Sequence, residues 1–241
     1  MQSRWENSDG DYIFEDYQPI GNEWTYNDTI SNSLTFRNAM QSAYTTFNGH
    51  LGKFDYQTGL RLEYDDRRLE QITSNETFTY QKFHLFPSFF VTRKLSDKHQ
   101  LQFTYSRRIQ RPGKWELNPF IEYRGASNVF YGNPGLKPQF TNAFELNYQY
   151  SLKKGFISLE TYYRATNDVI TRINGTQELN GRQVFFNTSI NGDREQSLGV
   201  ELMANTEPAK WLQLNLTGNL FRYQLDGQVD GESVTTVSTT W

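Results

Sequence analysis

The sequence predicts an all-β chain folded as an antiparallel up-and-down meander, and two observations lead to this prediction. Between residues 54 and 64, every even position except Thr58 is apolar or aromatic, whereas the odd positions are polar or glycine. Alternation with a period of two is typical of a strand that has one apolar and one polar face. The second observation is that short and long connections alternate along the chain, as they do in a meander with two unlike ends.

The same alternation, read in chain order, predicts about eight strands. Strand 80–94 is the least regular, because Phe86 and Phe90 interrupt its alternation, while Leu101, Phe103 and Tyr105 define the next apolar face clearly. In the C-terminal half the pattern is regular again, with leucine at positions 212, 214, 216 and 220. The predicted strands span 34–48, 54–66, 80–94, 100–110, 141–152, 156–171, 183–206 and 211–225, followed by half of a ninth from Ser233 to Trp241.

The lengths of the connections between the strands indicate the class of β-sheet protein. Short polar turns are expected near 49–52, 96–99, 153–155 and 207–210, and long connections at 1–31, 65–79, 111–140, 173–182 and from 226 onward. Loops longer than about 12–15 residues are uncommon in compact domains. Outer-membrane barrels, in contrast, have short turns at one end and long loops at the other. The chain is therefore predicted to be part of a transmembrane outer-membrane β-barrel.

A soluble all-β module that binds a ligand through aromatic side chains is the main alternative, because alternation alone does not say whether the apolar face meets lipid or a core. Aromatic residues near the strand ends, among them Phe54, Tyr64, Tyr150 and Trp211, favour the barrel, since such residues form girdles at the membrane interfaces. A complete eight-stranded barrel and an outer-membrane enzyme on a small barrel are two further alternatives.

The composition excludes several classes of protein. Of the 241 residues 16% are aromatic, which argues against disorder, and no run of about 20 apolar residues could form a transmembrane helix. There is no cysteine, so neither disulfides nor thiolate zinc sites are possible. The net charge of −3 gives no general attraction to nucleic acid. Residues 1–31 alone carry seven acids and one base, which suggests an acidic outer loop.

No residue pattern points to catalysis, and we predict neither an enzyme, nor a metal site, nor a cofactor. His84 and Ser88 share a strand face and could in principle form a nucleophilic pair, but a polar strand residue is the simpler interpretation. Acidic pairs such as Asp65–Asp66 lack a partner at the spacing that acid–base chemistry needs.

The connection 111–140 is the best candidate for a ligand-binding surface, because aromatic faces stack on sugars or planar chelators and arginine binds carboxylates. Its four prolines give a structural alternative, in which the loop simply folds onto itself and packs its own aromatic residues. The predicted ligand-binding residues lie in and beside its middle part: Trp115, Tyr123, Arg124, Phe130 and Tyr131.

Three short motifs in fixed order resemble the barrel of TonB-dependent outer-membrane receptors. They are Arg111-Pro112, the LNPF sequence at 117–120 and the GNP-x-L-x-P sequence at 132–138. The resemblance covers nearly the whole chain, in the family's order. It implies that residues 1–241 are a partial barrel without the plug domain and the remaining strands, and hence an open sheet with two unpaired edges.

The same resemblance implies a function. Receptors of this kind import a scarce nutrient, such as a siderophore or a glycan, with energy from an inner-membrane coupling protein that acts through the plug. The expected partners are outer-membrane lipid and lipopolysaccharide, the coupling protein, and a small molecule or oligosaccharide. The sequence does not name the ligand.

Overall fold

The computed structural model describes residues 2–20, 23–27, 31–125, 127–192, 194–229 and 232–240. Its main feature is one sheet of ten strands, each antiparallel to its neighbours. In spatial order these are β1 (Gln2–Phe14), β4 (Asn32–Leu51), β5 (Phe54–Gln71), β6 (Glu76–Lys94), β7 (His99–Gln110), β10 (Gln139–Leu152), β11 (Gly155–Asn167), β14 (Arg194–Ala209), β15 (Leu212–Val229) and β16 (Glu232–Thr240).

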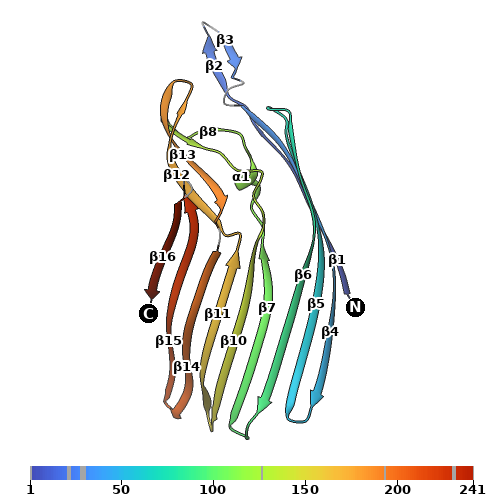
Figure 1. The fold of residues 1–241 in the computed structure, drawn as a ribbon, viewed down its shortest axis with the longest axis vertical. Helices are drawn as coiled ribbons and strands as arrows, with labels where there is room; N and C mark the ends of the chain where they lie inside the picture. The colour runs from blue at the N-terminus through green and yellow to red at the C-terminus, as the bar shows by residue number, and fades with distance from the viewer. Residues whose placement is uncertain are drawn as a thin grey trace.

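The sheet does not close into a ring. β1 and β16 are the first and last strands of the order, and they lie at opposite edges (Figure 1). The open sheet with two unpaired edges agrees with the prediction, and the closed eight-stranded alternative does not. A free edge exposes a row of unpaired backbone N–H and C=O groups, which is costly in lipid.

The four short turns lie at one end of the sheet and the connection 111–138 at the other, as predicted. The long connection expected from 226 onward was wrong, because β15 continues to Val229 and β16 begins at Glu232. The turns between β4 and β5, β6 and β7, β10 and β11, and β14 and β15 gather at the lower end in Figure 1. The first of these is the two-residue turn Gly52-Lys53, where Gly52 adopts a φ of 62° that suits glycine. We call the two ends the short-turn end and the long-loop end.

Several predicted boundaries were wrong at the long-loop end. Residues 2–14, expected in a loop, form β1, and the connection expected at 65–79 is reduced to a turn at 72–75 because β5 and β6 continue. The connection expected at 173–182 is a hairpin of β12 (Ile170–Leu179) and β13 (Arg182–Asn191). The strand expected at 183–206 is therefore split between β13 and β14, and the one expected at 156–171 ends at Asn167.

Smaller elements occupy the long-loop end. β12 and β13 form a four-stranded sheet with β9 (Asn128–Phe130) and β8 (Glu122–Tyr123), and β2 (Tyr17–Ile20) pairs with β3 (Glu23–Tyr26). The helix α1 (Lys114–Leu117) has four residues. Within the described residues, no helix is long and apolar enough to cross a membrane.

The two faces of the main sheet differ as the alternation predicts. In β10, Phe144, Leu146 and Tyr148 are exposed, whereas Glu145 and Asn147 between them are half-buried. The inner face of β5 is covered instead: its alternate residues from Glu63 to Gln71 are buried, including Asp65, Arg67 and Leu69. The connection between β7 and β10 provides the cover, because Leu117 and Leu136 complete a buried cluster with Leu34 and Leu69.

Candidate ligand-binding site at the long-loop end

The connection between β7 and β10 is fixed in place by the residues of its two longer motifs. Asn118 accepts a hydrogen bond from Gln71 at 3.1 Å, and Leu136 accepts one from Arg67 through its backbone oxygen at 3.2 Å. A Cβ at Gly132 would lie 2.7 Å from the backbone N and O of Asn118, so only glycine fits there. These motif residues therefore have a structural role, as the alternative interpretation of this loop proposed.

Trp115 remains accessible on top of this cover. Its side chain is 48% exposed, and its ring meets that of Tyr12 edge-on with centroids 5.5 Å apart. The Lys114 ammonium lies over the Tyr12 ring, 3.6 Å from its centroid, and also contacts the Tyr12 hydroxyl. A cation over an aromatic face is attracted by the ring quadrupole. These contacts hold β1 against α1 and fix the orientation of Trp115.

Two adjoining cavities are built around this tryptophan. One, of about 550 Å³, lies between β1 and the connection, and is lined by Tyr12, Phe14, Phe120 and Tyr123 among others. The other, of about 570 Å³, extends toward β9 and β13 and includes Phe130. Residues common to both cavities are Trp115, Glu122 and Arg124.

Arg124 stands between the two cavities in a defined position. Its guanidinium lies 4.5 Å from the centroid of the Phe130 ring and 3.4 Å from a carboxylate oxygen of Glu122. The side chain is 62% exposed, so several of its N–H donors still face solvent. The cationic side chain of Arg124 and the aromatic side chains of Trp115 and Phe130 therefore surround one opening.

Four of the five predicted ligand-binding residues thus line these cavities, and Tyr131 does not. The Tyr131 hydroxyl lies 3.4 Å from the side-chain oxygen of Gln177, and its ring packs against Phe186. Tyr131 therefore connects β9 to the β12–β13 hairpin. Other segments bring further residues to the cavities, and these were not predicted because none of them is near 111–140 in sequence. They are Asp11, Tyr12, Ile13, Phe14 and Asn32 in one cavity, and Arg172 and Asn187 in the other.

A charged cluster lies beneath the connection. Arg111 donates to Glu63 and to Asp65, with both N–O distances 2.7 Å. Burial opposes the charge of Arg111, but the hydrogen bonds to the two carboxylates outweigh it, and the pKa of the guanidinium is raised above its ordinary value. One carboxylate oxygen of Asp65, Oδ1, is buried and has no hydrogen-bond partner within the described residues.

This charged cluster connects the two parts of the main sheet at the place where β6 and β7 separate. β6 and β7 pair only from Ser88 to Lys94 and from Gln100 to Ser106, and beyond that point each strand follows its other neighbour. Beyond that point side-chain contacts replace the backbone pairing of β6 and β7. The ring centroids of Phe140 and His84 are 5.1 Å apart, and the Arg107 guanidinium lies 4.8 Å from the Phe140 centroid. Arg111 makes the corresponding ionic bridge.

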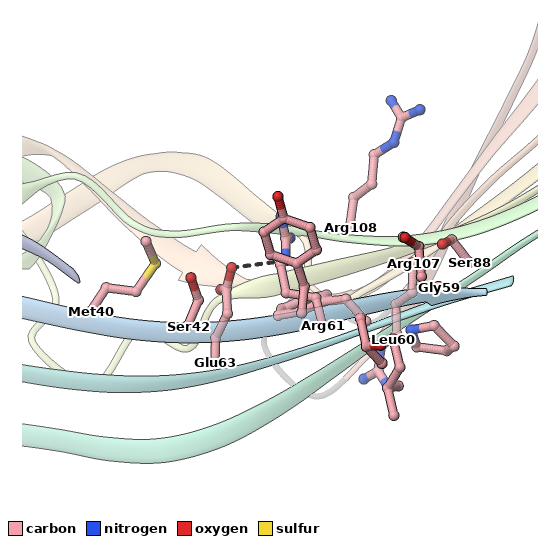
Figure 2. A pocket seen from close by; sticks show the side chains of 14 residues that line it. Met40, Ser42, Gly59, Leu60, Arg61, Glu63, Ser88, Arg107 and Arg108 are labelled. Carbon is pink, nitrogen blue, oxygen red and sulfur yellow. Dashed lines mark ion pairs between the residues drawn. The ribbon is translucent and has the colours of Figure 1, made fainter. Parts of the chain in front are cut away.

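A third cavity, of about 430 Å³, opens beside this division (Figure 2). It is lined by β4, β5, β6 and β7, and in Figure 2 Arg61 pairs with Glu63 while Arg108 extends away from that pair. The three arginines of this cavity, Arg61, Arg107 and Arg108, therefore do not converge on one point, and we assign no ligand to it.

Neither catalysis nor a metal site is apparent in the described residues. His84 and Ser88 are four residues apart on one strand, which separates them by ~13 Å. The His84 ring instead contacts the Tyr80 hydroxyl at 3.3 Å. Within the described ranges no three His, Asp or Glu side chains are close enough to hold a metal ion.

The solved structures that this chain resembles include two receptors and a transporter. The ferric enterobactin receptor PfeA of Pseudomonas aeruginosa, in a variant form, matches with a TM-score of 0.54 and 16% identity, covering 98% of this chain and 46% of that one. The siderophore receptor PirA of P. aeruginosa gives 0.55 and 11%, covering 98% and 56%, and the copper transporter OprC gives 0.56 and 16%, covering 98% and 40%. At these identities the likeness establishes the fold.

The chain spans about half the length of the receptor structures that it matches, 46% for PfeA and 56% for PirA. The comparison with curated proteins gives no match. The family comparison, in contrast, covers all of the sequence: the outer membrane protein beta-barrel family matches residues 1–241. The chain therefore belongs to the outer membrane protein beta-barrel family.

Proposed function

We propose that this chain forms part of the wall of an energy-coupled receptor, which captures a scarce nutrient such as a siderophore or a glycan at the long-loop end. The observation that supports this most directly is the pair of cavities that share Trp115 and Arg124. They open at the end of the sheet that outer-membrane barrels turn toward the outside of the cell.

The side chains around these cavities suit a ligand with planar or ring-shaped parts and a negative charge. Trp115 and Tyr123 offer aromatic faces that can stack on a sugar ring or a flat chelator. Arg124 offers N–H donors in the geometry that binds a carboxylate in two places. The chain contributes binding and orientation, and no covalent step is part of the proposal.

Transport of the captured ligand requires energy that this segment does not itself supply. We propose that it comes from the inner membrane, through the coupling protein and a plug domain that the barrel surrounds. Barrels of 22 strands in outer-membrane transporters have such a plugged lumen. Uptake that continues after a protonophore collapses the inner-membrane gradient would contradict this part of the proposal.

Ligand capture can be tested with two probes on the full-length protein in detergent: ferric enterobactin and the neutral oligosaccharide maltohexaose. Isothermal titration calorimetry should show binding of one probe, and Trp115→Ala should weaken that binding by up to about tenfold, since one aromatic contact contributes roughly 0.5–1.5 kcal/mol. Tyr131→Phe is the matched control and should bind as the wild type does. Binding of none of the probes, or equal binding by wild type and Trp115→Ala, would contradict the proposed site.

A further inference from the structure

The four short turns share a composition that the barrel fold does not require. Each turn combines lysine with a large apolar residue, and several of these apolar residues are strongly exposed: Leu51 by 73%, Leu95 by 52% and Trp211 by 83%. We call the segments 49–56, 93–99, 151–156 and 206–212 the short-turn rim. They lie together at the lower end of the sheet in Figure 1.

The short-turn rim is positively charged within an acidic chain. It contains seven lysines and arginines but only three acids, a net charge of +4, while the whole chain has −3. Within the described part of the chain, Lys154 is the only rim lysine that has an ion-pair partner, which is Glu207 at 2.9 Å. The lysines left without such a partner are all exposed: Lys53, Lys94, Lys98, Lys153 and Lys210.

The apolar members of the rim continue the lipid-facing surface. Leu51 has the parity of Phe47 on β4, and Leu95 has the parity of Leu85 and Phe89 on β6, all of which are exposed on the outer face. The lysines therefore begin where the apolar band ends, at the depth of the lipid headgroups. A long side chain can place its ammonium among headgroup phosphates while its methylenes stay on apolar surface.

We propose that the short-turn rim binds anionic phospholipid headgroups in the leaflet of the outer membrane that faces the periplasm. Charge complementarity supports this partner, since a basic residue near an anionic membrane surface is attracted to it. The exposed apolar residues favour a bilayer over a soluble acidic protein. Trp211, beside Lys210, is of the type that prefers the interface between acyl chains and headgroups.

The test is the selectivity of the folded, full-length protein for phosphatidylglycerol over phosphatidylcholine in nanodiscs that contain equal amounts of both. Spin-labelled derivatives of the two lipids report the fraction held at the protein surface by electron paramagnetic resonance. At low salt we expect phosphatidylglycerol to be preferred about fivefold, the factor that ~1 kcal/mol gives. The preference should fall as added salt shortens the Debye length.

Two triple variants test whether the lysines of the short-turn rim, and not basic residues elsewhere on the protein, cause the lipid preference. Replacing Lys53, Lys98 and Lys210 by glutamine should remove most of the preference. Replacing Lys82, Lys137 and Arg182, which are exposed away from the rim, makes the same change in charge and should leave the preference unchanged. Circular dichroism confirms that both variants retain the β-sheet spectrum of the wild type.

Three results would overturn the proposal. The first is equal affinity of the wild type for the two lipids, and the second is an equal loss in both triple variants. The third is a rim variant that keeps the lipid preference of the wild type but loses the wild type's binding to soluble poly-glutamate. That outcome would indicate that the short-turn rim binds an acidic protein instead of lipid.

Discussion

Replacing Arg111 by methionine should destabilise the fold far more than the loss of an exposed ion pair. The guanidinium binds Glu63 and Asp65 with both N–O distances at 2.7 Å, and the side chains of the two acids are only 5% and 3% exposed. Without Arg111 both carboxylates stay buried without that partner. Removing one partner of a buried ion pair costs about 3–5 kcal/mol, and Arg111 is itself 25% exposed, so we expect about 3 kcal/mol.

The assay is equilibrium unfolding in urea of the full-length protein in detergent micelles, followed by tryptophan fluorescence. Arg164→Met is the matched control, because Arg164 is 47% exposed and lies 3.3 Å from Glu145. An exposed pair of this kind contributes about 0–1 kcal/mol. The two variants remove the same charge and differ in the burial of the partners.

A rescue experiment checks the electrostatic reason. Glu63→Gln and Asp65→Asn, combined with Arg111→Met, should recover part of the lost stability, because neutral amides cost less to bury than unpaired carboxylates. The reasoning is refuted if Arg111→Met costs no more than Arg164→Met, or if the two added substitutions lower stability further.

Three further predictions use the same unfolding assay. Gly132→Ala should cost about 1–3 kcal/mol, since its Cβ would lie 2.7 Å from backbone atoms of Asn118; an unchanged midpoint would contradict the close contact. Gln71→Leu should cost about 1–3 kcal/mol, because two buried asparagine side chains lose the donor at 2.7 and 3.1 Å; a neutral effect would contradict this. Leu60→Arg should cost about 2–4 kcal/mol on the lipid face, and Gln57→Arg on the inner face much less; equal costs would argue against the assigned faces.

The sequence alone predicts the membrane-facing part of the fold well, because lipid imposes alternation there. The same signal disappears where the strands leave the membrane. In β5 the outward residues Asp66, Arg68 and Glu70 are polar, so hydropathy does not show that the strand continues to Gln71. β1 has no apolar alternation, and its pairing with β4, as at Gly10 and Phe36, is what makes it a strand.

The candidate site could be predicted only in part, for a related reason. Trp115, Tyr123, Arg124 and Phe130 belong to one connection, and their aromatic and basic character is visible in sequence. Tyr12 lies 102 residues before Lys114, and only the pairing of β1 at the sheet edge brings the two together. Nothing in the local sequence distinguishes Tyr131, which packs on Phe186, from its neighbours that line the cavities.

The central claim is that the short turns face the periplasm and the long connections face the outside of the cell. The chain contains no cysteine, so single cysteines introduced into it can be labelled selectively. Ser74→Cys and Asn128→Cys lie at the long-loop end and should react with a membrane-impermeant maleimide on intact cells, whereas Asp97→Cys in a short turn should react only after the outer membrane is permeabilised. Labelling of Asp97→Cys on intact cells, to the same extent as the other two, would contradict the account.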